Sequence, residues 1–316
     1  MVTTVRATTA PPAAPVRRRP LWTRRRRETL AAYAFLAPDL IGLLVFVVAP
    51  MLLALGVSFY KVDGFGNYTF IGLDNFRRMA HDQTLWHSVQ VTATYVITFV
   101  PITFVVSLVL AMLVRDHFPG VGWARTAFFL PNVISLVVIG LLWQFLLVDK
   151  QGIAAHLLRP AGLDNVSFLG NSKLAFASYV GISVWFLMGY QMLIFLAGIK
   201  DIPKEYEDAA RIDGAGGWQR FRHVIWPLLR PTSFFVVVTS MIGAVTGLQA
   251  FDLVFVLTKG GPANATSTIV FYIYKQAFQF GNYGYAAAIT TVLVAFLVVV
   301  TGVLFALTRG GRFHAE

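Results

Sequence analysis

Acidic side chains gather in one stretch of the sequence, where they could support acid–base chemistry. Residues 200–230 hold six Lys or Arg residues and five acids, which are Asp201, Glu205, Glu207, Asp208 and Asp213. An enzyme acting on lipid-linked sugars would need such a carboxylate cluster at one face of a membrane. Three of these acids, however, directly follow Pro203, a residue that suits the first turn of a helix. Negative charge is stabilising there, at the positive end of the helix dipole, so the cluster is also typical of a helix start.

The other reactive residue types offer little chemistry. The chain has no cysteine, which excludes disulfides, cysteine nucleophiles and thiolate metal sites. Its six histidines show no metal-ligand spacing, and no acid–base pair lies within an apolar run. No Gly-x-x-x-x-Gly-Lys-Ser/Thr phosphate loop is present. We therefore expect no catalytic residue, no metal and no bound cofactor, and we do not expect an enzyme.

The composition places the chain in a membrane. Of its 316 residues, 57% are hydrophobic and 13% are charged, whereas soluble domains carry about 25% charged residues. A soluble enzyme and a disordered scaffold are both excluded. Crossing a bilayer takes about 20 apolar residues in a helix. Six charge-free runs are long enough, and they predict an all-α integral membrane protein with spans at about residues 35–60, 88–114, 126–148, 174–199, 231–257 and 285–308.

The distribution of basic residues predicts the topology. If the N-terminus is inside, the inner loops and tails hold 18 of the 26 Lys and Arg residues. This bias places both termini in the cytoplasm. We expect a basic, disordered tail at residues 1–29, a six-helix membrane domain at 30–310 and a short tail at 311–316. The arginine run at residues 17–27 could bind nucleic acid or lipid, but beside the first span we interpret it as an orientation signal.

The inner loop at residues 200–230 predicts two short helices. The first starts after Pro203 and ends at Gly214, which can adopt the left-handed conformation that closes a helix. The second starts near Trp218 and leads through Pro227 into the fifth span. Small side chains at Ala209 and Ala210 would let another surface approach closely. We interpret this helix–turn–helix as a docking element.

The same loop resembles the EAA motif of the inner-membrane permease subunits of ABC importers. That motif reads Glu-Ala-Ala, three residues, Gly, nine residues, then Ile-x-Leu-Pro. Here Asp208, Ala209 and Ala210 are followed at the same distances by Gly214 and Pro227. The chain departs from the motif in having Asp208 for Glu, Val224 for Ile and Trp226 for Leu.

Two further segments narrow the resemblance to carbohydrate-importer permeases. Phe-Ile-Gly-Leu-Asp-Asn-Phe at residues 70–76 and Phe-Asp-Leu through Leu-Thr-Lys-Gly-Gly-Pro at residues 251–262 are similar to segments of the maltose-transporter (MalF) and glycerol-3-phosphate-transporter (UgpA) type. The resemblance covers about residues 30–310 and implies the six-helix, MetI-like fold of type I importers. It also implies a multi-pass protein of a bacterial or archaeal plasma membrane.

The resemblance implies a machine as well as a fold. A second, homologous permease subunit completes the translocation path, a dimer of ABC ATPase subunits binds ATP and magnesium, and an extracytoplasmic solute-binding protein delivers a carbohydrate. No nucleic acid is expected. The residues that match or flank the motif are the expected ATPase contacts: Glu205, Asp208, Ala209, Ala210, Gly214, Trp218 and Pro227.

A substrate path is expected among the polar and aromatic residues of the spans. Such side chains tend to face the bundle interior or a water-filled cavity, although each could simply hold helices together. The candidates are Asn132, Gln144, Trp185, Tyr190, Gln191, Thr246, Gln249 and Asp252. Amides suit a neutral polyol because they both donate and accept hydrogen bonds.

An ion-coupled secondary transporter is the alternative function. That class buries acidic or histidine residues midway through a span. Asp39 and Asp252 lie near span ends instead, which argues against it.

Overall fold

The computed structural model describes residues 24–62, 66–116, 118–148, 152–153, 166–247 and 249–307. The expected tail at 311–316 and the first 23 residues of the tail at 1–29 lie outside these ranges. Residues 24–29 of the expected tail are helical and form the start of α1, which begins at Arg24. The chain divides into two compact units, Met1–Leu53 and Ala54–Glu316, and each is described separately.

From Arg24 onward, the first unit is one continuous helical segment. It consists of α1 (Arg24–Leu43), the π-helical turn η1 (Leu44–Val48) and the start of α2 (Ala49–Val57). Together these elements give an apolar helix of 30 residues at Glu28–Val57. At 1.5 Å per residue, such a helix is long enough to cross a bilayer.

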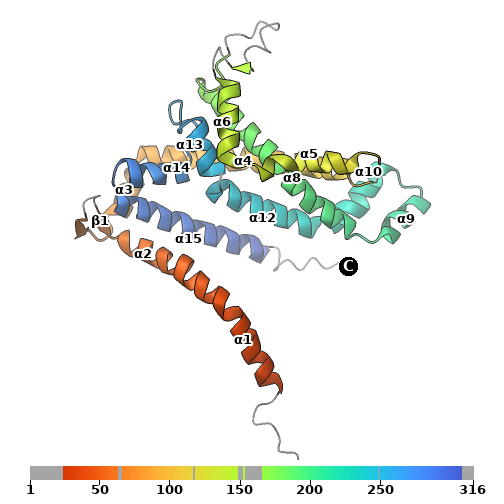
Figure 1. The fold of residues 1–316 in the computed structure, drawn as a ribbon, viewed down its shortest axis with the longest axis horizontal. Helices are drawn as coiled ribbons and strands as arrows, with labels where there is room; N and C mark the ends of the chain where they lie inside the picture. Colours follow the sequence, from red (N-terminus) through yellow and green to blue (C-terminus); the bar gives the residue numbers. More distant parts are fainter. Residues whose placement is uncertain are drawn as a thin grey trace, which may run out of the picture. The chain divides into compact units, whose positions relative to one another are not determined.

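The second unit contains the remaining helices and one small hairpin (Figure 1). Strands β1 (Tyr60–Val62) and β2 (Tyr68–Phe70) pair antiparallel, with Tyr60 opposite Phe70. The long helices are α3 (Asp74–His81), α4 (Gln83–Leu113), α5 (Val121–Val133), α6 (Leu136–Leu147), α8 (Ser172–Lys200), α9 (Lys204–Ile212), α12 (Arg230–Thr246) and α15 (Tyr283–Leu307). Shorter helical turns are α10 (Gly217–Arg220), η3 (Phe221–Ile225), α11 (Trp226–Leu228), η4 (Gln249–Leu253), α13 (Val254–Leu257), α14 (Ile269–Tyr274) and η5 (Lys275–Gln279).

The described residues contain four helices that are long and apolar enough to cross a membrane, and two bent pairs raise this number to six if each pair is one span. The expected third span is one of these pairs: α5 and α6 meet at 96°. Its helix is interrupted because Ile134 and Ser135 adopt extended backbone angles, with ψ of 143° and 131°. The expected fifth span, at residues 231–257, is also not one continuous helix. Its helix α12 ends at Thr246, and the backbone of Gly247 is extended, with ψ of 173°.

The core follows the contact between α4 and α8. Tyr95 and Tyr179, both fully buried, stack with ring centroids 4.4 Å apart. Around them lies an apolar cluster that includes residues of α6, η4 and α13. A second cluster joins the end of α4 to the end of α8 and to η3, through Val114, Ile199 and Ile225. This second cluster positions the loop that carries α9 and α10.

A polar network centred on Asp82 joins three segments at the other end of the second unit, where Figure 1 shows α3, β1 and the start of α15. Asp82 Oδ1 caps α4 by accepting the N–H groups of Thr84 and Leu85 at 3.0 and 3.1 Å. Asp82 Oδ2 accepts the hydroxyls of Tyr272 and Tyr285, each at 2.6 Å. Arg78 adds its guanidinium 4.0 Å from the centre of the Tyr285 ring.

This network predicts an acid-sensitive stability. Burial raises the pKa of the Asp82 carboxyl, but the hydrogen bonds from Tyr272, Tyr285 and the two backbone N–H groups outweigh it and lower the pKa below its ordinary value of 3.8. A carboxyl with a lowered pKa stabilises the fold fully above its unfolded pKa, and that contribution is lost as the pH falls through the folded pKa. We expect the melting temperature of the wild type to exceed that of Asp82→Asn by a constant amount above about pH 5. This difference in melting temperature should disappear as the pH falls below 3.8. A difference that does not change with pH would contradict this role.

Candidate functional site

The first helix of the loop between α8 and α12 presents two different faces. Glu207 and Ala210 are partly buried, whereas Asp208 and Ala209 are exposed. Ile212, an apolar residue, is 87% exposed. Glu205 is exposed as well. The outward face of α9 thus combines a carboxylate, a small residue and an unburied apolar side chain.

The turn after α9 is closed by a Schellman motif. Gly214 has φ of +79°, a conformation that favours glycine. Its N–H donates to the Arg211 carbonyl at 3.1 Å, and the Ala215 N–H donates to the Ala210 carbonyl at 2.9 Å. These two bonds satisfy carbonyls that the end of a helix would otherwise leave free.

The second helix of the loop runs from Gly217 to Leu228, with a π-helical turn at Phe221–Ile225. Trp218 is 70% exposed and stacks on Phe221, with ring centroids 5.5 Å apart. Ile225 is 2% exposed and anchors this helix in the second apolar cluster. Pro227 lies in α11, directly after the π-helical turn and just before the bend that leads into α12.

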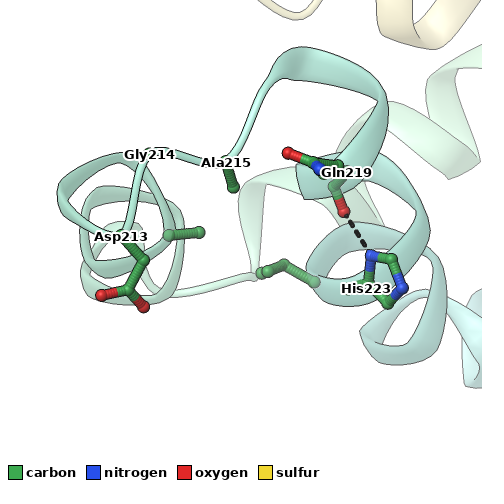
Figure 2. Close-up of a pocket in the computed structure, with 7 residues that line it drawn as sticks. Asp213, Gly214, Ala215, Gln219 and His223 are labelled. Carbon is green, nitrogen blue, oxygen red and sulfur yellow. Dashed lines mark hydrogen bonds between the residues drawn. The ribbon is translucent and has the colours of Figure 1, made fainter.

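A hollow of about 490 Å³ separates the two helices of the loop. Figure 2 shows Asp213, Gly214 and Ala215 on one side of it and Gln219 and His223 on the other. The His223 ring lies within hydrogen-bond distance of the Gln219 carbonyl, with Nδ1 at 3.0 Å. The hollow is open, its lining mixes polar and apolar groups, and Ala210 borders it from α9.

An ion pair fastens the inward face of α9 to the bundle. Arg115, which directly follows the end of α4, donates from Nη2 to Glu207 Oε2 at 2.8 Å. Neither residue is among the site residues expected from the sequence. The two are 92 positions apart, so their contact could not be read from the sequence. No spacing or motif signal connects them.

The eight expected substrate-path residues differ in how far the bundle buries them. Gln191 and Gln249 are buried, and Tyr190 and Thr246 are exposed. The other four are half-buried: Asn132, Gln144, Trp185 and Asp252. No hydrogen bond joins two of the eight side chains in the part of the chain that the structure describes. Gln191 instead donates to Ser240 Oγ at 2.7 Å, which links α8 to α12. The backbone carbonyl of Gln249 accepts the Tyr179 hydroxyl at 3.2 Å.

Trp185 borders a second, smaller cavity. Its ring meets that of Trp143 edge-on, with centroids 5.8 Å apart. The cavity measures about 320 Å³ and is otherwise lined by Leu147, Phe168, Ser178, Gly181 and Ile182. The lining is mostly apolar, so a solute in this cavity would mainly contact the aromatic rings that border it.

Comparison with known proteins is consistent with this geometry. Residues 108–310 match the family described as the inner membrane component of binding-protein-dependent transport systems. A probable ABC transporter permease protein of Bacillus subtilis, YesP, is 36% identical over 285 residues, which cover 89% of this chain and 91% of YesP. AmyD of Thermoanaerobacterium thermosulfurigenes, a probable permease for starch degradation products, is 32% identical over 88% of this chain and 93% of its own length. The sn-glycerol-3-phosphate permease UgpA of Brucella abortus is 34% identical over 86% of this chain and 92% of its own length.

The fold also has solved counterparts. A chain of a bacterial ABC transporter that imports the acidic polysaccharide alginate aligns with a TM-score of 0.78, covering 90% of this chain and 96% of that one. At 23% identity, this similarity is one of fold. A second structure, of an alginate ABC transporter in complex with an alginate-bound periplasmic protein, gives a TM-score of 0.80 at 22% identity. The fold is therefore the MetI-like permease fold, and the chain belongs to the family of inner-membrane permease components of binding-protein-dependent ABC transport systems.

Proposed function

We propose that this chain is one of two transmembrane subunits of an importer that carries a carbohydrate or a glycerol-3-phosphate-like solute across the plasma membrane. The observation that carries the proposal is family membership over most of the chain, with relatives named for starch products and glycerol 3-phosphate. A neutral sugar fits best, because the expected spans carry few basic residues that could pair with an anionic cargo.

We infer that α9 and α10 dock into an ATPase subunit on the cytoplasmic side. The outward face of α9 supports this, since Asp208, Ala209 and Ile212 have no cover from the bundle. Trp218 adds an exposed aromatic side chain beside them. Aromatic anchors of this kind dominate many protein interfaces. Glu205, Ala210, Gly214 and Pro227 complete the proposed contact region, the last three through the shape of the loop.

The proposed docking of α9 also implies on which side of the membrane the termini lie and which subunits complete the importer. With α9 in the cytoplasm, six spans place both termini there as well, in agreement with the distribution of basic residues. ATP and magnesium belong to the ATPase dimer, and this chain needs no cofactor of its own. A second permease subunit and an extracytoplasmic binding protein complete the complex.

The proposed path for the solute runs along α6, α8 and the segment that follows α12. Trp185 offers a ring for stacking beside a cavity, and Gln191 and Gln249 offer amides in the interior. Asn132 and Gln144 lie on the bent third span, and Tyr190, Thr246 and Asp252 lie on α8, at the end of α12 and on η4.

The test is purification of the tagged chain from its native membrane in mild detergent, followed by mass spectrometry of its companions. We expect an ABC ATPase, a second permease and a solute-binding protein, and the binding protein can then be screened against neutral sugars and glycerol 3-phosphate. A chain that purifies alone and transports solute without ATP would overturn the proposal in favour of an ion-coupled secondary transporter.

A further inference from the structure

The ion pair between Arg115 and Glu207 differs from the other charged contact of α9. Its two side chains are only 14% and 17% exposed, and its atoms are 2.8 Å apart. The Asp208–Arg211 pair on the outward face is longer, at 3.6 Å, and its side chains are 63% and 59% exposed. A pair so exposed contributes little, whereas a buried charge that loses its partner is costly.

The backbone that carries Arg115 is itself held firmly. Arg125, on α5, donates from Nε to the Val114 carbonyl at 3.2 Å and from Nη2 to the same oxygen. Val114 is 1% exposed and belongs to the second apolar cluster, together with Ile199 and Ile202 near the end of α8. Arg115 therefore projects from a point at which α4, α5 and α8 are joined.

The chemistry of the pair fixes direction as well as distance. A guanidinium is planar and always charged, and its hydrogen bonds to a carboxylate are short and directional. Asp116 lies 3.5 Å from Arg115 Nε, but at 81% exposed it cannot replace Glu207 as a buried partner. A displacement of α9 must therefore either carry Arg115 with it or break a buried ion pair.

From this geometry we infer that Arg115 and Glu207 form a positioning pair that passes movement of α9 directly to α4. The chain connection already links α9 to α8 through residues 201–203. The ion pair adds a second route, which enters the bundle on the helix that packs along α8. The inference rests on the proposed docking of α9 to an ATPase and adds residues outside the docking surface.

The experiment uses the complete importer, purified with its partners and reconstituted in liposomes. The variants are Arg115→Glu, Glu207→Arg and the double variant that exchanges the two charges. Asp74→Arg is the matched control, because it makes the same change of charge as Glu207→Arg at an exposed position on α3, away from the pair (Figure 1). The readout is solute imported per ATP hydrolysed, with co-purification of the ATPase as the measure of assembly.

We expect each single reversal to lower the transport-to-hydrolysis ratio by about fivefold or more in an assembled complex, and the exchange to restore most of it. Asp74→Arg should keep the wild-type ratio. Wild-type ratios in the single variants, a failure of the exchange to restore the ratio, or loss of assembly in place of a lowered ratio would each overturn the inference. Failure of the proposed function is distinguishable, because the wild-type complex itself would then neither hydrolyse ATP nor import solute.

Discussion

Asp208→Arg is expected to abolish ATP-driven import while leaving the chain in the membrane at its normal level. Asp208 is 63% exposed, and its contact with Arg211 is a weak surface pair, so the fold loses little when the carboxylate is removed. A docking surface that accepts an anion, in contrast, rejects a cation at a cost of about 2–5 kcal/mol. The measurement is solute uptake by cells or liposomes that contain the full importer, with the amount of membrane-inserted chain determined by immunoblotting.

Asp208→Glu is the control for this change. It keeps the carboxylate and restores the residue that the EAA motif has at this position, so uptake should remain close to that of the wild type. Normal uptake by Asp208→Arg would contradict the assignment of α9 to the ATPase contact.

Gly214→Asp tests the same surface by a different route and is also expected to abolish import. Gly214 has φ of +79°, where a residue other than glycine costs about 1–2 kcal/mol. A Cβ at Gly214 would meet nothing within 4 Å, so the chain itself has room for a side chain. A larger loss of import than of stability would therefore point to a clash with a docked partner. If Gly214→Asp imports normally, the turn is not part of the contact.

The parts of this molecule that depend on local sequence could be predicted well. The apolar runs at residues 88–114, 174–199 and 285–308 correspond closely to α4, α8 and α15, since hydropathy and helix length act locally. The turn at Gly214 could be predicted too, because glycine after a helical segment is the residue that adopts positive φ most easily.

The bends in the helices could not be predicted from composition. The run at residues 126–148 has no charge anywhere, and hydropathy is the same for a straight helix as for two helices at 96°. The pattern of apolar residues does not encode the break at Ile134–Ser135.

Contacts between distant segments were also beyond sequence reasoning. Tyr272 and Tyr285 reach Asp82 across 190 and 203 positions. None of the three residues matches a motif, and a tyrosine near a membrane edge is ordinary. The expected substrate path shows the same limit, because a polar residue in an apolar run indicates an interior position without indicating its neighbours. Gln191 is interior, as expected, but its hydrogen bond to Ser240 joins two helices.

The close approach of α5 and α8 at Gly189 is a packing feature at which a mutation is expected to cost considerable stability. A Cβ on Gly189 would lie 1.9 Å from the Phe128 carbonyl oxygen and 2.8 Å from the Phe129 Cα. These are backbone atoms, so no side chain can rotate out of the way, and the two helices would have to separate. We expect Gly189→Ala to lower the free energy of unfolding by about 3 kcal/mol or more, at the upper end of overpacking effects.

Gly181→Ala is the matched control, because Gly181 lies on the same helix and a Cβ there would meet nothing within 4 Å. Its stability should change by about 1 kcal/mol or less, since only helix propensity is affected. The measurement is thermal unfolding in detergent, followed by the fluorescence of the seven tryptophans. Equal melting temperatures for the two variants would contradict the contact between α5 and α8. A selective loss at Gly189 would instead show that glycine is required there by the neighbouring backbone, and that the bent third span is held in place against α8 next to Tyr190.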